Sequence, residues 1–228
     1  MKRCIICLKE LDLFQGLERE QFTNLCQCTR RKRLSKGHSL FRQGETTSTI
    51  YLIKSGKLKL VQTAEDGDEI ILDVCGPGEV LGELSLYQEQ NQHSSAIAME
   101  DVCICCFSKL QFESLIKQDS SFALRIISYL GQKRYENSLR LGKEARQTVK
   151  ERLLQLFYRL AEQYGQKTST STLIDLKITQ QELADMIGSS RVMLIQALNE
   201  LKVANIIDRE KTYYVLKSDP CISAHIFE

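Results

Sequence analysis

Long apolar segments are missing from this chain of 228 residues. The longest wholly apolar run, from Val102 to Phe107, has six residues, whereas a membrane-spanning helix needs about 20. No apolar segment follows Lys2 and Arg3, so a secretory signal peptide is not expected. We therefore expect a cytoplasmic protein without a membrane partner.

Histidine is scarce, and the motifs of common nucleotide-dependent enzymes are absent. The three histidines, His38, His93 and His225, lie in no metal-binding or catalytic-triad motif. The chain has no P-loop or dinucleotide-binding fingerprint, and its glycines fall at expected strand turns instead of leading into a helix. We expect a protein that is not an enzyme and has no catalytic residues.

A strong excess of charge is also missing, because the formal net charge is only +2. Residues 148–228 contain ten basic and ten acidic residues. If this part of the chain binds nucleic acid, local patches and not the net charge must attract the phosphates.

Cysteine, in contrast, is abundant: the chain has nine. In a reducing compartment this odd number argues against a structural disulfide framework and favours metal, redox or core-packing roles. Cys4 and Cys7 form a CxxC pair, which by itself is compatible with zinc, a redox pair or neither.

Residues 35–107 have strand character. Val, Ile, Leu and Tyr alternate there with polar residues, and seven glycines punctuate the pattern. Asp66-Gly67 is a strong hairpin signal and Ser55-Gly56 a weaker one. Short strands at this spacing predict a small β-barrel or jelly roll.

Helices are predicted after the strands. Residues 109–117 form a short helix and residues 119–143 a long one. A capping box of Thr148 and Glu151 then opens an amphipathic helix that extends to about Tyr164.

The sequence between residues 179 and 201 predicts two short helices joined by a tight turn. Thr179 is a good N-cap, and Glu182 completes a capping box. Gly188 supplies the backbone freedom for the turn, and Ser189 or Ser190 caps the second helix. Apolar faces at helical spacing are formed by Leu183, Ala184 and Ile187 in the first helix and by Leu194, Ala197, Leu198 and Leu201 in the second.

This arrangement leaves polar and apolar residues of the second helix available for another molecule. A helix-turn-helix places such residues against base edges in the DNA major groove; the alternative is an ordinary helical hairpin in a small core. The predicted DNA-binding residues are Thr179, Gln180, Ser189, Ser190, Arg191, Val192 and Gln196. A polar loop at 168–172 precedes the motif, and residues 206–216, with a charged turn at 208–211, resemble the wing of a winged helix.

Nearly the whole chain resembles the Crp/Fnr family of bacterial transcription regulators. Four segments carry the resemblance: KGHSLFRQGE at 36–45, IYLIKSGKLKL at 50–60 as a central hairpin, PGEVLGEL at 77–84 as a phosphate-binding cassette, and the DNA-reading element at 178–201. The resemblance implies an α+β fold of three parts. These are an N-terminal arm and a cyclic-nucleotide-binding-like sensor β-barrel (jelly roll) at 1–118, a long dimerisation helix at 119–145, and a winged helix-turn-helix domain at 146–228.

The resemblance also implies a homodimer whose long helices pair. Such a dimer would bind a palindromic double-stranded DNA operator and, if it is an activator, RNA polymerase. A mixed stripe on the long helix fits this pairing, and it consists of Ile127, Leu130, Arg134, Asn137 and Leu141. A helix that merely packs on its own barrel would explain the first half of the stripe equally well.

The resemblance also implies an effector pocket, but one residue pair in it departs from the family pattern. Gly82 and Glu83 match the pair that binds the ribose in relatives that bind cyclic AMP, and Asn137-Ser138 takes the place of the hydroxyl pair that contacts adenine. His93-Ser94 replaces the Arg-Ser pair that holds the cyclic phosphate, and a mostly neutral imidazole is a poor substitute for a bidentate cation. We therefore expect that cyclic AMP is not the inducer.

The cysteines suggest a different signal. The oxygen-sensing branch of the family binds an iron–sulfur cluster through three N-terminal cysteines and one barrel cysteine, but its third N-terminal position is Leu13 here, and Cys26 and Cys28 have an unfamiliar spacing. Cluster-less FNR-like proteins of lactic acid bacteria are more similar, because they keep a CxxC and a barrel cysteine and switch by a disulfide between them.

By this resemblance the redox residues are Cys4, Cys7 and Cys105, with no cofactor. An iron–sulfur cluster, zinc, a small ligand or no signal at all remain alternatives. Core packing is expected of Cys75, Cys103, Cys106 and Cys221.

Base recognition is expected to differ from that of better-known relatives. Arg191 takes the position whose arginine reaches a guanine in the cyclic-AMP branch, whereas Val192 and Gln196 replace a glutamate and an arginine that read bases in many relatives. Val192 is suited to a thymine methyl group and Gln196 to an adenine edge.

Overall fold

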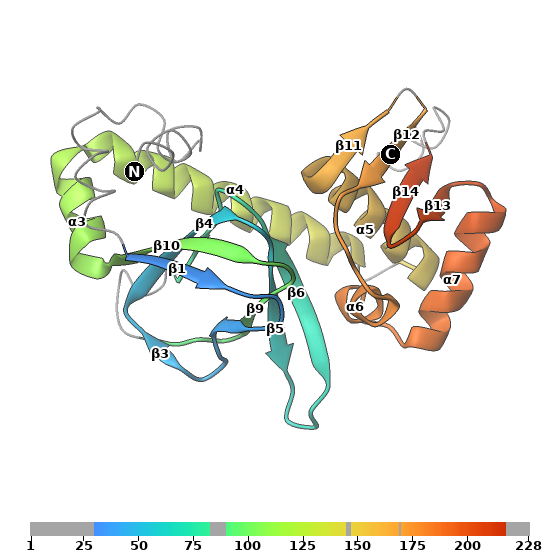
Figure 1. Cartoon of the computed structure of the whole chain (residues 1–228), viewed down its shortest axis with the longest axis horizontal. Helices are drawn as coiled ribbons and strands as arrows, with labels where there is room; N and C mark the ends of the chain where they lie inside the picture. Colours follow the sequence, from blue (N-terminus) through green and yellow to red (C-terminus); the bar gives the residue numbers. More distant parts are fainter. Residues whose placement is uncertain (1–29, 83–89, 145–146, 169, 218–228) are drawn as a thin grey trace. The chain divides into compact units, whose positions relative to one another are not determined.

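The computed structural model describes residues 30–82, 90–144, 147–168 and 170–217 (Figure 1). The chain forms two compact units, Met1–Leu139 and Arg140–Glu228, and the boundary between them lies within a long helix. In the described part of the chain, no helix has both the length and the apolar character needed to cross a membrane.

The first unit is built mainly of short antiparallel strands. The strands are β1 (Arg30–Leu34), β2 (Ser39–Phe41), β3 (Thr46–Thr47), β4 (Thr49–Ser55), β5 (Leu58–Thr63), β6 (Glu69–Cys75), β7 (Val80–Leu81), β8 (Gln90–Asn91), β9 (Ser95–Ala98) and β10 (Val102–Ser108). They form one sheet in the order β1-β10-β4-β7, a second in the order β2-β9-β5-β6, and the pair β3-β8. The sheets resemble a jelly roll and do not close into a barrel, so the fold class is confirmed in its open form.

Two turns expected to form hairpins have different outcomes. Asp66-Gly67 joins β5 to β6, which pair as a hairpin, and Gly67 has a positive φ of 90°. Ser55-Gly56 follows β4, but β4 and β5 belong to different sheets, so the predicted central hairpin at 50–60 is wrong. A Cβ on Gly56 would lie 2.5 Å from the Asp101 carbonyl oxygen, and this close approach needs glycine where the chain crosses between sheets.

Apolar side chains from both sheets form the core of the first unit. Its buried cluster consists of Leu34, Leu40, Phe41, Tyr51, Ile53, Leu58, Cys75, Leu81, Ala96, Ala98, Val102 and Ile104. Helices α3 (Lys109–Gln118) and α4 (Ser120–Glu144) pack on the opposite face near the end of β10. There the ring centroid of Phe112 lies 6.3 Å from that of Phe107 and 5.4 Å from that of Phe122.

The second unit is a winged helix. Its elements are α5 (Val149–Tyr164), β11 (Gly165–Lys167), β12 (Ser171–Ile174), α6 (Gln180–Met186), α7 (Arg191–Val203), β13 (Ile207–Glu210) and β14 (Tyr213–Lys217). The strands form a sheet in the order β11-β12-β14-β13. Phe157 of α5 and Tyr214 of β14 are buried with ring centroids 5.1 Å apart, so the helices share a core with the sheet.

Two local expectations for the second unit are wrong. The polar loop predicted at 168–172 includes the start of β12, which pairs with β14. The charged turn predicted at 208–211 is mostly strand, because Asp208, Arg209 and Glu210 all pair with β14 and the turn is confined to residues 211–212. Short, polar strands carry little of the apolar alternation on which sequence-based prediction depends.

Candidate functional site

Side-chain caps define where α6 and α7 begin. The Thr179 side chain accepts a hydrogen bond from the Glu182 backbone N–H, and the Glu182 carboxylate accepts one from the Thr179 backbone N–H. Ser190, and not Ser189, is the N-cap of α7, and its Oγ accepts a hydrogen bond from the Met193 backbone N–H. These caps satisfy backbone N–H groups that a helix leaves without partners at its first turn.

Gly188 gives the turn its shape with a positive φ of 57°. The Ser189 backbone N–H closes the end of α6 by donating to the Ala184 carbonyl oxygen at 3.0 Å. Arg152 of α5 adds a tertiary contact, because its Nη1 donates to the Ile187 carbonyl oxygen at 2.7 Å. The end of α6 is thereby held against α5, which sequence reasoning had not anticipated.

Helix α7 has one buried and one exposed face. The four residues predicted to pack, Leu194, Ala197, Leu198 and Leu201, are all buried. Val192 is 75% exposed and Ile195 36% exposed, and both are apolar. Arg191 and Gln196 are also exposed, and Gln196 Nε2 donates to the Glu200 Oε1 at 3.5 Å. An exposed face of this composition at the start of a helix can contact both base edges and phosphates.

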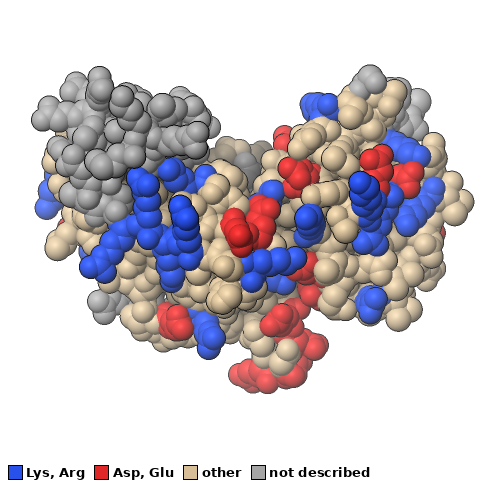
Figure 2. Space-filling model, in the orientation of Figure 1, with Lys and Arg blue, Asp and Glu red and all other residues tan. Residues whose placement is uncertain are grey.

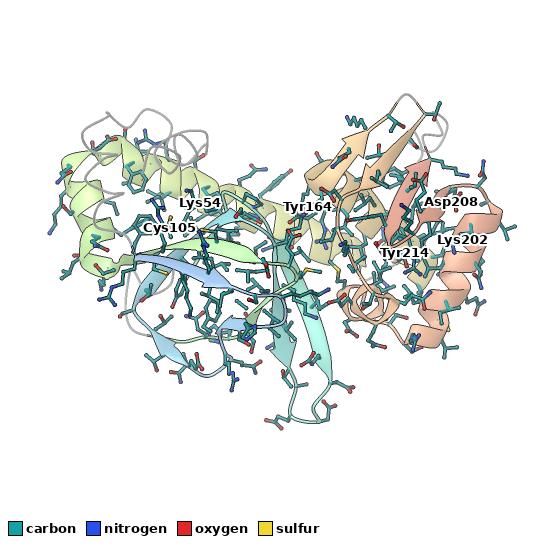
Figure 3. The ribbon with its side chains drawn as sticks, viewed as in Figure 1. Lys54, Cys105, Tyr164, Lys202, Asp208 and Tyr214 are labelled. Atoms are coloured by element: carbon teal, nitrogen blue, oxygen red, sulfur yellow. The ribbon has the colours of Figure 1, made fainter. Side chains whose placement is uncertain are left out.

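The segment before α6 and the wing both place cations next to aromatic rings. The Lys177 Nζ lies 5.9 Å from the centroid of the Tyr213 ring, and the Arg209 guanidinium lies 5.5 Å from that of Tyr214. A hydrogen bond from the Arg209 backbone N–H and an ion pair with Lys217 lower the pKa of Asp208. Figure 3 labels Lys202, Asp208 and Tyr214 in this unit.

The residues expected to bind an effector are only partly described. Gly82 has a positive φ of 77°, and a Cβ there would lie 2.6 Å from the Thr49 carbonyl oxygen. His93 is exposed and Ser94 half-buried in the bend between β8 and β9. Glu83 lies outside the described residues.

The other two effector candidates, Asn137 and Ser138, are exposed on α4. The same helix exposes the apolar side chains of Leu124, Ile127 and Leu130 by 68%, 65% and 37%. Phe122 and Ile126 on another face of the helix are buried. The first part of α4 therefore packs on its own unit through one face and leaves an apolar strip on another.

An ion pair joins α4 to the segment at 77–84, and sequence reasoning missed it. Glu79 accepts hydrogen bonds from Lys133 Nζ and from the Gly76 backbone N–H, the latter at 2.6 Å. Burial lowers the pKa of Lys133, but the hydrogen bond and charge of Glu79, together with Tyr129 and Asp73, outweigh burial and raise this pKa. The Tyr129 hydroxyl accepts a hydrogen bond from the Val80 backbone N–H at 3.3 Å, and burial raises the pKa of Tyr129 to about 12.

The redox candidates are also only partly described, because Cys4 and Cys7 lie outside the described residues. Cys105 is completely buried on β10, where it pairs with Leu52 of β4. Lys54 lies two residues further along β4 (Figure 3). Among the described residues, none of the cysteines at 75, 103, 105 and 106 is in a disulfide.

Comparison with known proteins assigns one family to each part of the chain. Residues 31–119 match the cyclic nucleotide-binding domain family, and residues 151–219 match the Crp-like helix-turn-helix domain family.

Similar proteins span most of the chain. The "Cyclic AMP receptor protein" of Thermus thermophilus is 29% identical over 204 residues, which cover 88% of this chain and 89% of that protein. A "CRP-like cAMP-activated global transcriptional regulator" of Mycobacterium tuberculosis is 26% identical over 191 residues, 84% of this chain and 85% of that protein. In fold, a solved structure of a CooA mutant from Carboxydothermus hydrogenoformans is similar, with a TM-score of 0.78, 21% identity, and coverage of 96% of this chain and 97% of that one.

The jelly-roll-like sheets, the helix-turn-helix with the exposed face of α7, and both family matches lead to one conclusion. This chain belongs to the Crp/Fnr family of DNA-binding transcription regulators, which are not enzymes.

Proposed function

We propose that the protein is a cytoplasmic homodimer in which α7 of each copy reads one half of a palindromic operator. The exposed face of α7, which begins at Arg191 next to a capped N-terminus, is the observation that supports this proposal. Helix-turn-helix dimers insert such a face into successive major grooves, so that a two-fold protein matches a two-fold operator. If the protein is an activator, RNA polymerase is its second partner.

The apolar strip of α4 is the proposed dimer interface. Leu124, Ile127 and Leu130 recur at helical spacing and are exposed, which is costly unless another surface covers them. Ile127→Glu should give monomers in analytical ultracentrifugation and abolish operator binding, because two carboxylates would be buried at a two-fold interface. Ile127→Leu is the matched control and should stay dimeric. A dimeric Ile127→Glu variant would place the interface elsewhere.

We further propose a thiol–disulfide switch that links Cys105 to Cys4 or Cys7, as in the cluster-less FNR-like proteins of lactic acid bacteria. On the adjacent strand, Lys54 comes two residues after Leu52, which pairs with Cys105, so the strand next to the proposed switch residue carries a cation. Because Cys105 is buried, oxidation requires a local opening of the sheet. Such an opening would make the response slow at low oxidant concentrations.

The redox proposal is tested by oxidant titration while DNA affinity is measured. Cys105→Ser should lose the response and keep the affinity of the reduced parent. The matched control is Cys106→Ser, a half-buried neighbour on the other face of β10, which should respond like the parent. A normal response in Cys105→Ser would exclude this pairing.

The alternative is an iron–sulfur cluster or zinc. Within the described part of the chain, no three His, Cys, Asp or Glu residues are grouped to hold a metal ion. Cys4, Cys7, Cys26 and Cys28, which would have to contribute, lie outside it. Colour, metal content and thiol counts of protein purified without oxygen distinguish the possibilities: a brown protein has a cluster, and the loss of two thiols in air indicates a disulfide.

Two relatives carry cyclic AMP in their names, so this ligand is tested first. We infer that it is not the inducer here, because His93 takes the place of the phosphate-binding arginine. Calorimetry with the purified dimer should detect no binding. Micromolar affinity together with improved operator binding would overturn this inference and restore Glu83, Ser94 and Asn137 as ligand contacts.

A further inference from the structure

A hollow of about 550 Å³ lies where three neighbouring strands of the first unit's β1-β10-β4-β7 sheet, β1, β10 and β4, begin or end. Its polar lining comes from the end of β1, the end of β4 and the start of β10, and consists of Arg33, Ser35, Lys54, Ser55, Asp101 and Cys103. The volume falls within the range of small-molecule sites, about 300–1,000 Å³.

None of the described effector candidates, Gly82, His93, Ser94, Asn137 and Ser138, lines the hollow. Arg33 pairs with Cys103, and Cys103 pairs with Ser55. Leu34 and Val102, which belong to the buried core cluster, supply the apolar part of the lining. Because side chains alternate across a strand, Arg33 and Cys103 are on the face that points away from that core.

A β-bulge redirects the chain at this place. Cys103 pairs with Ser55 and Ile104 pairs with Ile53, so the register between β10 and β4 shifts by one residue at Lys54. Bulges of this kind re-aim a side chain and are frequent next to functional sites. Here the bulge brings Lys54 to the same hollow as Arg33.

The charges of the lining favour an anion. Arg33 and Lys54 are cations and Asp101 is a carboxylate, so the formal charge of the lining is +1. The Asp101 Oδ1 accepts a hydrogen bond from the Lys36 backbone N–H at 3.2 Å. Figure 2 shows Lys and Arg side chains gathering over the region where Figure 1 places β1. The Ser35 and Ser55 hydroxyls add hydrogen-bond donors. An arginine fork, an ammonium group and hydroxyls together suit a carboxylate or a phosphate.

We propose that this hollow is a second ligand site, which binds a small anion carrying a phosphate or carboxylate group. The anion pairs with Arg33 and Lys54 and lies against the Cys103 thiol, which is half-buried in the lining. This site does not depend on the proposed operator, dimer or disulfide.

Cys103 serves as the reporter of occupancy. The reduced full-length protein is treated with the neutral reagent iodoacetamide, and alkylation of Cys103 is followed by peptide mass spectrometry. Inorganic phosphate and succinate are the probes, with sodium chloride at equal ionic strength as the reference. Cys106, a half-buried thiol on the other face of β10, is the internal standard.

Phosphate or succinate should slow the alkylation of Cys103 several-fold relative to chloride and leave Cys106 unchanged. Protection by phosphate alone assigns a phosphorylated ligand, and protection by succinate alone assigns a carboxylate. Arg33→Gln and Lys54→Gln should each abolish the protection. Arg30→Gln is the matched control, because it removes the same charge from the other face of β1 and should keep the protection.

Equal alkylation rates in phosphate, succinate and chloride would overturn the proposal. It would also fail if Arg30→Gln removed the protection as completely as Arg33→Gln does, because the effect would then come from general charge. Lys54→Gln provides an independent test if Arg33→Gln does not fold.

Discussion

The two units of this regulator are specified by their sequences in different ways. In the second unit, neighbouring residues determine each helix: Thr148 and Thr179 cap α5 and α6, and Gly188 forms the turn before α7. In the first unit, β1 pairs with β10 from the other end of the unit, whereas the consecutive strands β4 and β5 lie in different sheets. Residues that are neighbours in sequence set the helix boundaries, whereas strand pairing depends on residues from the whole unit.

The difference between the two units predicts that a core mutation in the second unit strongly lowers the stability of that unit alone. Phe157 is completely buried against Tyr214, and Phe157→Ala should lower the free energy of unfolding by about 3–5 kcal/mol because it leaves a cavity. Hydrogen exchange read by mass spectrometry should show faster exchange in residues 149–217 and little change in the sheets of the first unit.

Phe157→Leu is the control for this change and should cost less, since it keeps most of the buried volume. Equally faster exchange in both units would contradict the independence of their cores.

The next effect concerns recognition of DNA by the second unit. Arg191→Ala should cost roughly 1–3 kcal/mol of operator affinity and relax the preference at one symmetric pair of positions. Lys177→Ala is the matched comparison and should weaken all sequences alike, because a phosphate contact carries no base information. Selection from randomised DNA measures both. The same consensus for wild type and Arg191→Ala would mean that Arg191 only positions the helix.

The features that could be predicted from the sequence are those whose signals lie in neighbouring residues. The capping residues and the buried face of α7 were correctly predicted because their signals lie within a few residues. The central hairpin was wrong, because nothing in residues 50–60 tells which sheet each strand joins. Glu79 and Lys133 meet only through folding, and so do Arg33 and Lys54, so no local pattern identifies either group.

A pH titration should reveal the long-range contacts of the first unit. The pKa of Tyr129 is raised by burial to about 12, from an ordinary value of 10.0. Above pH 10 the unfolded chain releases this proton before the folded protein does, so the free energy of unfolding falls as pH rises to 12. The contribution is complete below pH 10 and is on the order of 1–2 kcal/mol.

Tyr129→Phe should flatten part of this fall and destabilise the protein by about 1 kcal/mol at neutral pH, because the Val80 backbone N–H loses its acceptor. Denaturant unfolding followed by circular dichroism at stepped pH measures both effects. Tyr135→Phe, which removes an exposed hydroxyl from the same helix, is the control. A Tyr129→Phe profile equal to that of the parent would contradict the assignment.

The smallest expected effect tests whether one capping residue stabilises α6 of the second unit. Thr179→Ala removes the N-cap of α6 and should cost about 1 kcal/mol, whereas Thr179→Ser keeps the hydroxyl and should be nearly neutral. Thermal unfolding of the two variants provides the measurement. A loss in Thr179→Ser as large as in Thr179→Ala would mean that the threonine methyl group, and not the cap, stabilises the helix.

The two faces of α7 have a consequence for how this regulator can change its target genes. The residues that hold the helix in its unit and those that are exposed to solvent are different sets, with Leu194 and Leu198 in the first and Val192 and Gln196 in the second. Substitutions in the exposed set alter little buried surface, so they change stability by only about 0.5 kcal/mol or less. In the proposed mode of DNA binding, single substitutions at Val192 or Gln196 are therefore expected to change the operator preference and to leave folding intact, so these positions are suited to redirecting the protein to a chosen DNA site.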